Sequence, residues 1–306
     1  MSDSPAVHLG PDQRDDLADA VRRGGGRLVD LADAEAVVWA GGASTFPDEL
    51  PESVRWVQLP SAGIESWIDA GTVDTSRTWT SAVGAYSDVV AEHAVALLLA
   101  GMRGIVGSSR ASSWLPDEVG PPQSTLKGAT VAIVGAGGIG RAMIPALTAL
   151  GAEVVAVTRR GLPVDGAVDT LPADRVSEVF DRADHVVLAA PATSQTKALV
   201  GADELAAIGS SGWLVNIARG SLVDTDALVE ALNDGTLGGA ALDVTDPEPL
   251  PDGHPLWTAR NALITPHVAN PAHLQGGALA DRVEENVRRF AAGEDLEGVV
   301  DLDRGY

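Results

Sequence analysis

Short apolar runs rich in β-branched residues recur along the chain from residue 129 onward, and each is followed by a segment whose apolar positions have helical spacing. Strands that alternate with helices form βαβ units, and such units build a parallel sheet with helices on both faces. The pattern therefore predicts a doubly wound α/β sheet of six strands, at residues 130–134, 153–158, 185–190, 213–217, 239–244 and 262–265.

A weaker version of this pattern precedes it and predicts a second, smaller α/β domain. Its apolar runs are separated by Gly, Pro and Asp and lie at residues 37–40, 54–59 and 78–82. Helical periodicity over residues 86–103 predicts a helix that carries the chain into the larger domain. The last helical pattern, 279–292, has no strand of its own to cover, so we expect it to return to the first domain. The predicted domains are residues 1–91 with 274–306, and residues 92–273.

A glycine-rich turn follows the run at 130–134 and reads Gly135-Ala136-Gly137-Gly138-Ile139-Gly140. A G-x-G-x-x-G turn between a strand and a helix is typical of dinucleotide binding. Gly135 would permit the tight turn, Gly137 would let the backbone approach the pyrophosphate, and Gly140 would let helix and strand pack closely. Amides at the start of the helix would hold the phosphates, and we assign them to Gly138, Ile139 and Arg141. A glycine turn that binds nothing is the alternative.

The end of the next strand indicates which nicotinamide cofactor is bound. A carboxylate here accepts hydrogen bonds from the free ribose of NAD, but this chain reads Thr158-Arg159-Arg160, with no acid before Asp165. Two guanidinium groups favour the 2′-phosphate of NADP, to which they can donate charge-assisted hydrogen bonds. We predict NADP as the preferred cofactor, with NAD as a second option. A pair of solvated surface arginines is the alternative interpretation.

Three further patches follow strands, at residues 216–224, 242–251 and 264–270. They contain Arg219, Glu248 and His267. In an open α/β sheet, ligands bind outside the carboxyl ends of the strands, so these side chains are predicted to meet in one pocket. Taken singly, each could be structural, as a packed histidine, a loop carboxylate or an ion-pair partner. Their joint appearance at successive strand ends favours a shared chemical role.

In these motifs the chain resembles the D-isomer-specific 2-hydroxyacid dehydrogenases. The resemblance covers nearly the whole chain and rests on the glycine turn together with PSAGI at 60–64, VAEH at 90–93, LKG at 126–128, NIARGSLVD at 216–224, ALDV at 241–244, PEPLP at 247–251, HPLW at 254–257, TPHVAN at 265–270 and the closing GVVDLDRGY. It implies a Rossmann nucleotide-binding domain inserted into a split, flavodoxin-like substrate domain. It also implies a homodimer that reduces small 2-keto acids to D-2-hydroxy acids.

The resemblance gives each candidate residue a role. His267 would donate a proton to the developing alkoxide, for which an imidazole suits the working pH. Glu248 would bind the other ring nitrogen and favour the imidazolium form. Arg219 would pair with the substrate carboxylate and lie near the carbonyl oxygen. The backbone amides of Ala62 and Gly63 match the family's carboxylate-binding loop.

Other residues complete the predicted cofactor and substrate sites. Asp243 matches the position near the nicotinamide carboxamide, and a buried turn acid is the alternative. The cofactor site further includes Pro191, Ile217 and Ala218. His93 lies in a predicted packing helix and receives no catalytic role. Candidates for shaping the pocket around the substrate side chain, whose identity the sequence leaves open, are Trp67, Tyr86 and Trp257.

Composition narrows the range of partners and environments. Against 43 Asp and Glu there are 21 Lys and Arg, so the formal net charge is −22, and a nucleic acid or an anionic membrane would be repelled. No cysteine is present, which excludes disulfides and thiolate chemistry. The N-terminus has no signal-peptide pattern and no apolar run is long enough to span a bilayer, so we predict a cytoplasmic enzyme.

The same acidity suggests adaptation to salt. Only two of the basic residues are lysines, Lys127 and Lys197, and high acidity with scarce Lys resembles halophilic proteins. In molar salt the Debye length falls to about 3 Å, which screens surface repulsion. The alternative is an acidic protein from a mesophile, without adaptation to high salt.

Two other functions are compatible with this fold. A formate or phosphite dehydrogenase relative is the first, but the formate branch has glutamine where this chain has Glu248, and phosphite oxidation would favour NAD. The second is a dinucleotide-sensing binding protein, such as a corepressor, which would bind the cofactor without consuming it.

Overall fold

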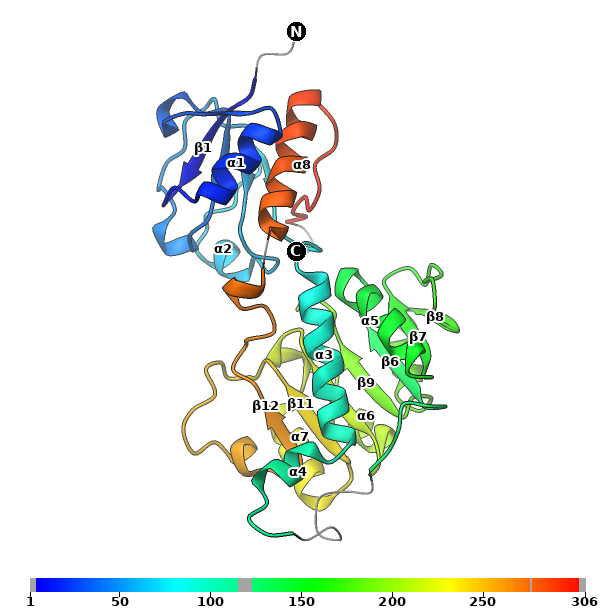
Figure 1. Ribbon diagram of the computed structural model, residues 1–306. Helices are drawn as coiled ribbons and strands as arrows, with labels where there is room; N and C mark the ends of the chain where they lie inside the picture. Colours follow the sequence, from blue (N-terminus) through cyan, green and yellow to red (C-terminus); the bar gives the residue numbers. More distant parts are fainter. Residues whose placement is uncertain (1–3, 115–122, 276, 303–306) are drawn as a thin grey trace. The chain divides into compact units, whose positions relative to one another are not determined.

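The chain forms two compact units in the computed structural model, which describes residues 4–114, 123–275 and 277–302 (Figure 1). The first unit comprises Met1–Tyr86 and Ala272–Tyr306, and the second comprises Ser87–Pro271. The sequence placed the first boundary at residue 91, but helix α3 (Ser87–Met102) begins earlier and lies wholly in the second unit. The last four residues of the closing motif GVVDLDRGY lie outside the described residues.

A parallel sheet of seven strands forms the middle of the second unit, in the order β12-β11-β10-β9-β6-β7-β8. The order reverses between β6 and β9, which is the switch point where doubly wound sheets bind nucleotides. The strands are β6 (Thr130–Val134), β7 (Glu153–Thr158), β8 (Asp169–Pro172), β9 (His185–Leu188), β10 (Trp213–Asn216), β11 (Gly239–Leu242) and β12 (Ala262–Ile264).

Six of these strands match the predicted runs, and β8 was missed. Its sequence, Asp-Thr-Leu-Pro, has no apolar run, and a proline is tolerated in a strand only because β8 lies at the edge of the sheet.

Helices cover both faces of this sheet, as the doubly wound prediction requires. On one face, α3 packs on β10 and β11 and on α5 (Gly138–Ala149), and Gly101 of α3 lies against the ring of Trp213. On the other, Leu214 joins a core cluster with apolar residues of α6 (Ala202–Ile208) and α7 (Thr225–Asp234). A short helix, α4 (Ile105–Arg110), follows α3.

Stability should fall on acidification below about pH 6.5, and His185 at the start of β9 should contribute to the loss. Burial lowers the pKa of this histidine, whose Nδ1 accepts a hydrogen bond of 3.2 Å from the backbone N–H of Trp213. The ring therefore stays neutral in the folded state, while the unfolded chain takes up a proton as the pH falls through its higher pKa. Above that range both states are neutral and His185 contributes nothing to the pH dependence.

Urea unfolding at pH 7 and pH 5 measures this contribution. The His185→Asn variant, whose amide oxygen can still accept from Trp213, should lose less unfolding free energy between the two pH values than the unmodified protein. His273→Asn serves as the control, because His273 is exposed. An equal loss in all three proteins would refute the assignment.

The first unit contains a smaller parallel sheet of five strands. Its order, β2-β1-β3-β4-β5, is the flavodoxin-like order. The strands are β1 (Ala6–Gly10), β2 (Arg27–Leu28), β3 (Ala36–Trp39), β4 (Trp56–Gln58) and β5 (Thr78–Thr80), and the helices are α1 (Asp15–Arg23), α2 (Glu65–Asp69) and α8 (Ala278–Ala292). Short 3₁₀ turns occur in both units, at Leu31–Asp33, Ala43–Thr45, Ala173–Val179, Gly220–Leu222, Pro255–Thr258 and Ala272–Leu274.

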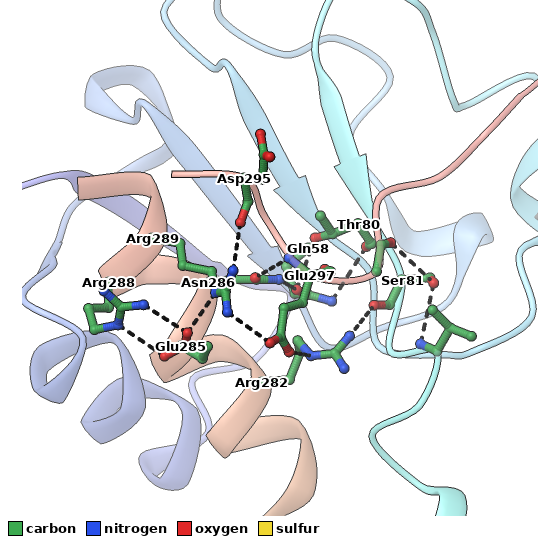
Figure 2. Close-up of polar contacts among 12 residues, drawn as sticks. Gln58, Thr80, Ser81, Arg282, Glu285, Asn286, Arg288, Arg289, Asp295 and Glu297 are labelled. Carbon is green, nitrogen blue, oxygen red and sulfur yellow. Dashed lines mark hydrogen bonds and ion pairs between the residues drawn. The ribbon is translucent and has the colours of Figure 1, made fainter. Parts of the chain in front are cut away.

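A buried polar network ties the C-terminal segment to this sheet (Figure 2). Helix α8 packs on α1, and its Asn286 donates a hydrogen bond of 2.9 Å to the side chain of Gln58 on β4. The hydroxyl of Thr80 donates to the same oxygen at 2.9 Å, and the backbone N–H of Glu297 donates to Asn286 at 2.8 Å. A buried polar group without a partner costs about 1–3 kcal/mol. Displacement of the C-terminal segment would leave groups of this network unpaired, so the network favours the packing of that segment on the sheet.

Candidate active site

Three neighbouring strands of the larger sheet place the candidate catalytic side chains at one edge. Arg219 follows β10, Glu248 follows β11 and His267 follows β12. These strands are adjacent and parallel, so their carboxyl ends lie at the same edge of the sheet. All three residues belong to the second unit.

His267 and Glu248 form a direct pair, with 2.6 Å between Nδ1 of the ring and Oε1 of the carboxylate. Their side chains are 52% and 41% exposed, and such open ion pairs contribute little to stability. The contact does fix the orientation of the imidazole. It engages Nδ1 and leaves Nε2 as the nitrogen that can meet another molecule.

Asp243 accepts hydrogen bonds from the loop that carries His267 and holds that loop in place. The backbone N–H of His267 donates to the Asp243 carbonyl at 2.8 Å, and its φ is +52°, a left-handed conformation that is uncommon outside glycine. The Asp243 carboxylate accepts from the backbone N–H groups of Val268 at 2.9 Å and Ala269 at 3.0 Å. The hydroxyl of Thr265 donates to the same carboxylate at 2.6 Å.

Asp243 is buried and ionised in this arrangement. Burial by itself would raise its pKa, but hydrogen bonds from His93, Thr265 and the two loop amides outweigh burial and lower the pKa to about 2. Since the carboxylate already has these partners within the chain, its predicted contact with the nicotinamide carboxamide stays a prediction.

The loop of Arg219 is shaped by Asn216, which the sequence did not single out. The Asn216 side chain accepts from the backbone N–H of Ala218 at 3.0 Å and donates to the Arg219 carbonyl at 2.9 Å. Nη1 of Arg219 donates to the Ala218 carbonyl at 2.7 Å, and the side chain is half-buried. The sequence signal that could have indicated Asn216 is a polar residue at the end of an apolar strand.

The Arg219 and Glu248 loops are packed together by a glycine. A Cβ at Gly220 would lie 2.0 Å from the carbonyl of Thr245, so only glycine allows this approach. The hydroxyl of Thr225 donates to the Asp246 carbonyl at 2.7 Å and joins the same two loops. The site is therefore built on rigid strand ends and mutually packed loops.

The glycine turn after β6 has the shape that a dinucleotide needs. Gly135 has a φ of +96°, and a Cβ there would lie 2.4 Å from the backbone N of Ala190. A Cβ at Gly140 would lie 2.9 Å from a methyl group of Ile133. A Cβ at Gly137 would meet nothing within 4 Å, so the start of α5 has open space beside it. Gly138 and Ile139 begin that helix, and their free amides can bind phosphate. The sequence assigned the same role to the Arg141 amide, but that N–H donates to the Gly137 carbonyl at 3.0 Å, because Arg141 lies far enough into the helix to have an intrahelical partner.

The ends of the strands beside β6 carry the other predicted cofactor residues. Arg159 and Arg160 follow β7 and are exposed. Thr158, the last residue of β7, has a buried hydroxyl with no hydrogen-bond partner in the described part of the chain, which suits a polar ligand. Pro191 follows β9, and Ile217 and Ala218 follow β10. The residues present therefore fit a nicotinamide dinucleotide along one sheet edge.

Ala62 and Gly63 belong to the first unit and follow β4. The Ser61 hydroxyl donates to the Gly63 carbonyl at 2.6 Å, and within the described residues neither the Ala62 nor the Gly63 amide donates a hydrogen bond. Two neighbouring free amides can bind an anion.

The three aromatic residues proposed to line a substrate pocket lie in different settings. Trp67 is buried in the core against Phe46, and Tyr86 is buried with its hydroxyl donating to the Pro60 carbonyl at 2.9 Å. Trp257 is exposed.

Residues 4–114, 123–275 and 277–302 include no helix with the length and apolar character that a membrane span requires. They contain no group of three His, Cys, Asp or Glu side chains that could hold a metal ion.

Comparison with known proteins identifies relatives over most of the chain. The family model "D-isomer specific 2-hydroxyacid dehydrogenase, NAD binding domain" matches residues 95–269. An uncharacterised protein of Corynebacterium melassecola is 43% identical, with 94% of this chain and 95% of that protein aligned. Glycerate dehydrogenase of Methylorubrum extorquens is 37% identical over 68% of this chain and 66% of its own length.

A solved structure is similar in fold over nearly the whole chain. It is the NADPH-dependent glyoxylate/hydroxypyruvate reductase of Sinorhizobium meliloti in complex with NADP and sulfate. Its TM-score is 0.78 at 25% identity, and the match covers 99% of this chain and all of that one.

Proposed function

Because the chain belongs to the D-isomer specific 2-hydroxyacid dehydrogenase family, we propose that it reduces small 2-keto acids to D-2-hydroxy acids, with NADPH as the preferred reductant. The observation that carries this proposal is the His267–Glu248 pair of 2.6 Å, which lies at the same sheet edge as the glycine turn. A proton donor and a dinucleotide turn at one edge suit the reduction of a carbonyl group.

In this proposal His267 acts as the general acid. The bound reduced nicotinamide would supply the hydride that adds to C2 of the keto acid. As that bond forms, the carbonyl π electrons move to oxygen, which takes a proton from Nε2 of His267. Glu248 holds Nδ1 and stabilises the imidazolium before transfer. The neutral ring then regains a proton from solvent.

Arg219 binds and orients the substrate carboxylate. Its planar guanidinium can form two parallel hydrogen bonds with a carboxylate, which a lysine cannot. The anchor from Nη1 to the Ala218 carbonyl limits the rotamers available to the side chain, so less entropy is lost on binding. The free amides of Ala62 and Gly63 are proposed as additional carboxylate donors.

The preference for NADPH rests on Arg159 and Arg160. They follow the strand next to the glycine turn, where dehydrogenases specific for NAD have an acid. The structurally similar Sinorhizobium enzyme is described as NADPH-dependent. The proposed substrates are small keto acids of the glyoxylate and hydroxypyruvate type, as in that enzyme.

The direct test is consumption of NADPH or NADH with a panel of 2-keto acids, from glyoxylate and hydroxypyruvate through pyruvate to branched-chain and aromatic acids. Turnover with small keto acids, and a D-hydroxy acid as product, would support the proposal. Cofactor binding without turnover on any of them would instead indicate a dinucleotide-sensing protein. Oxidation of phosphite or formate would indicate the other branch of the family.

We also propose that the enzyme is a cytoplasmic homodimer adapted to high salt. With a net charge of −22, charge repulsion should destabilise the fold in dilute buffer and weaken as salt is added. A gain of about 2 kcal/mol would raise the Tm by roughly 4–8 °C. Calorimetry from low to molar KCl measures this rise, with sucrose as an uncharged control. A Tm that stays flat or falls with KCl would contradict the salt adaptation.

A further inference from the structure

A histidine on helix α3 lies at the end of a hydrogen-bond chain that leads to the His267 loop. Nε2 of His93 is 3.1 Å from the hydroxyl of Thr265 and 3.4 Å from Oδ1 of Asp243. The His93 side chain is 24% exposed and that of Asp243 only 1%. The contact therefore joins helix α3 to the buried base of the loop.

The hydrogen positions in this chain follow from the distances. Thr265 has a single hydroxyl hydrogen, and the contact of 2.6 Å with Asp243 uses it, because an ionised carboxylate can only accept. The Thr265 oxygen can then only accept from His93. Nε2 of His93 must therefore carry a hydrogen, which it donates to Thr265 at 3.1 Å, with Asp243 as a second, more distant acceptor at 3.4 Å.

The far end of the chain holds the backbone on both sides of the catalytic ring. Asp243 accepts from the amides of Val268 and Ala269 with its carboxylate and from the amide of His267 with its carbonyl. His267 is held at a φ of +52°. A rotation of Asp243 would release both carboxylate contacts together, and the strained residue just before them would lose its support.

We propose that His93 is a positioning residue, which fixes the rotamers of Thr265 and Asp243 and thereby the orientation of His267. The proposal rests on the proposed function, in which His267 is the general acid, and His93 itself transfers no proton. A small misplacement of a catalytic group can lower turnover by up to about a hundredfold. His93 therefore acts on kcat, while cofactor and substrate affinity depend on other residues.

Paired variants of His93 test the proposal in the full-length protein. His93→Leu removes the donor and should lower kcat between about tenfold and a hundredfold, with KM for the keto acid and Kd for NADPH nearly unchanged. His93→Gln can place an amide N–H near the position of Nε2 and should retain most of the activity. Glu92→Gln, an exposed neighbour on the same helix, is the matched control and should be unchanged.

Hydrogen exchange gives a second measurement that needs neither cofactor nor turnover. The Val268 and Ala269 amides should exchange at least about tenfold faster in His93→Leu than in the unmodified protein or in His93→Gln. Unchanged kcat or unchanged exchange in His93→Leu would overturn the proposal, as would equal losses in the Leu and Gln variants. If the unmodified protein reduces no keto acid, the proposed function fails, and the exchange experiment still decides whether His93 holds the loop.

Discussion

Replacement of His267 by alanine is expected to lower the turnover of a 2-keto acid by about 10²–10⁴-fold, the usual contribution of a general acid. The residue follows β12, its Nδ1 faces Glu248, and the remaining ring nitrogen is the one that can reach a substrate oxygen. Because the dinucleotide turn lies after β6 and does not involve this side chain, the Kd for NADPH should be nearly unchanged. Steady-state kinetics and fluorescence titration with NADPH measure the two quantities.

Two further variants make this result specific. Glu248→Gln should lower turnover less than His267→Ala does, because an amide can still bind Nδ1 but no longer stabilises the imidazolium. His273→Ala changes an exposed histidine outside the second unit's sheet and should be silent. Equal activity of His267→Ala and the unmodified protein would remove His267 from the mechanism.

The larger sheet could be predicted from sequence because its strands are buried on both faces. Runs such as Thr130–Val134 are nearly all apolar, and both sheet faces are covered by helices. Strand β8 has only four residues, one of them a proline, and β2 has only two, so neither produces a pattern that stands out from a loop. Strand β1 was also missed, because a run of five residues without a preceding helix gives little periodicity to detect.

The common location of the candidate catalytic residues could be predicted for a different reason. Parallel strands bring their carboxyl ends to one edge, so the positions of Arg219, Glu248 and His267 after three strands placed them at a common edge, where His267 and Glu248 form a direct contact. Residues that act through other residues carry no such signal. The roles of Asn216 and His93 follow from their contacts, since an asparagine at a strand end is only a weak signal and a histidine in an apolar helix has many ordinary explanations.

Asp243 has tertiary contacts that the sequence did not indicate. The family resemblance assigned it a position near the nicotinamide carboxamide, after β11, and that contact stays a prediction. In the structure its carboxylate accepts hydrogen bonds from Thr265 and two loop amides, which a strand pattern cannot reveal. This arrangement links the cofactor edge of the sheet to the orientation of His267 through one buried carboxylate.

The Arg159→Ala, Arg160→Ala double variant is expected to lose its preference for NADPH over NADH. Each charge-assisted contact with the 2′-phosphate should contribute about 1.5–3 kcal/mol, which is roughly tenfold to a hundredfold in affinity. The same arginines offer the 2′-hydroxyl of NAD no acceptor, so discrimination comes from attraction to one cofactor and poor pairing with the other. The expected change in the ratio of kcat/KM values is therefore about 10²–10⁴-fold when both side chains contribute.

Single variants measure how much each arginine contributes to the NADPH preference, and added salt measures how far the preference depends on charge. Arg159 already interacts with another group of the chain, so Arg159→Ala and Arg160→Ala need not contribute equally, and each is measured separately. Both side chains are exposed, so molar KCl should screen part of the attraction and reduce the NADPH preference of the unmodified protein. Arg141→Ala removes an exposed guanidinium from the first turn of α5, and any loss of attraction to the pyrophosphate should weaken both cofactors alike, because that group is common to them. If the unmodified protein prefers NADH, or if the double variant keeps the preference for NADPH, Arg159 and Arg160 are solvated surface residues and the cofactor is selected elsewhere.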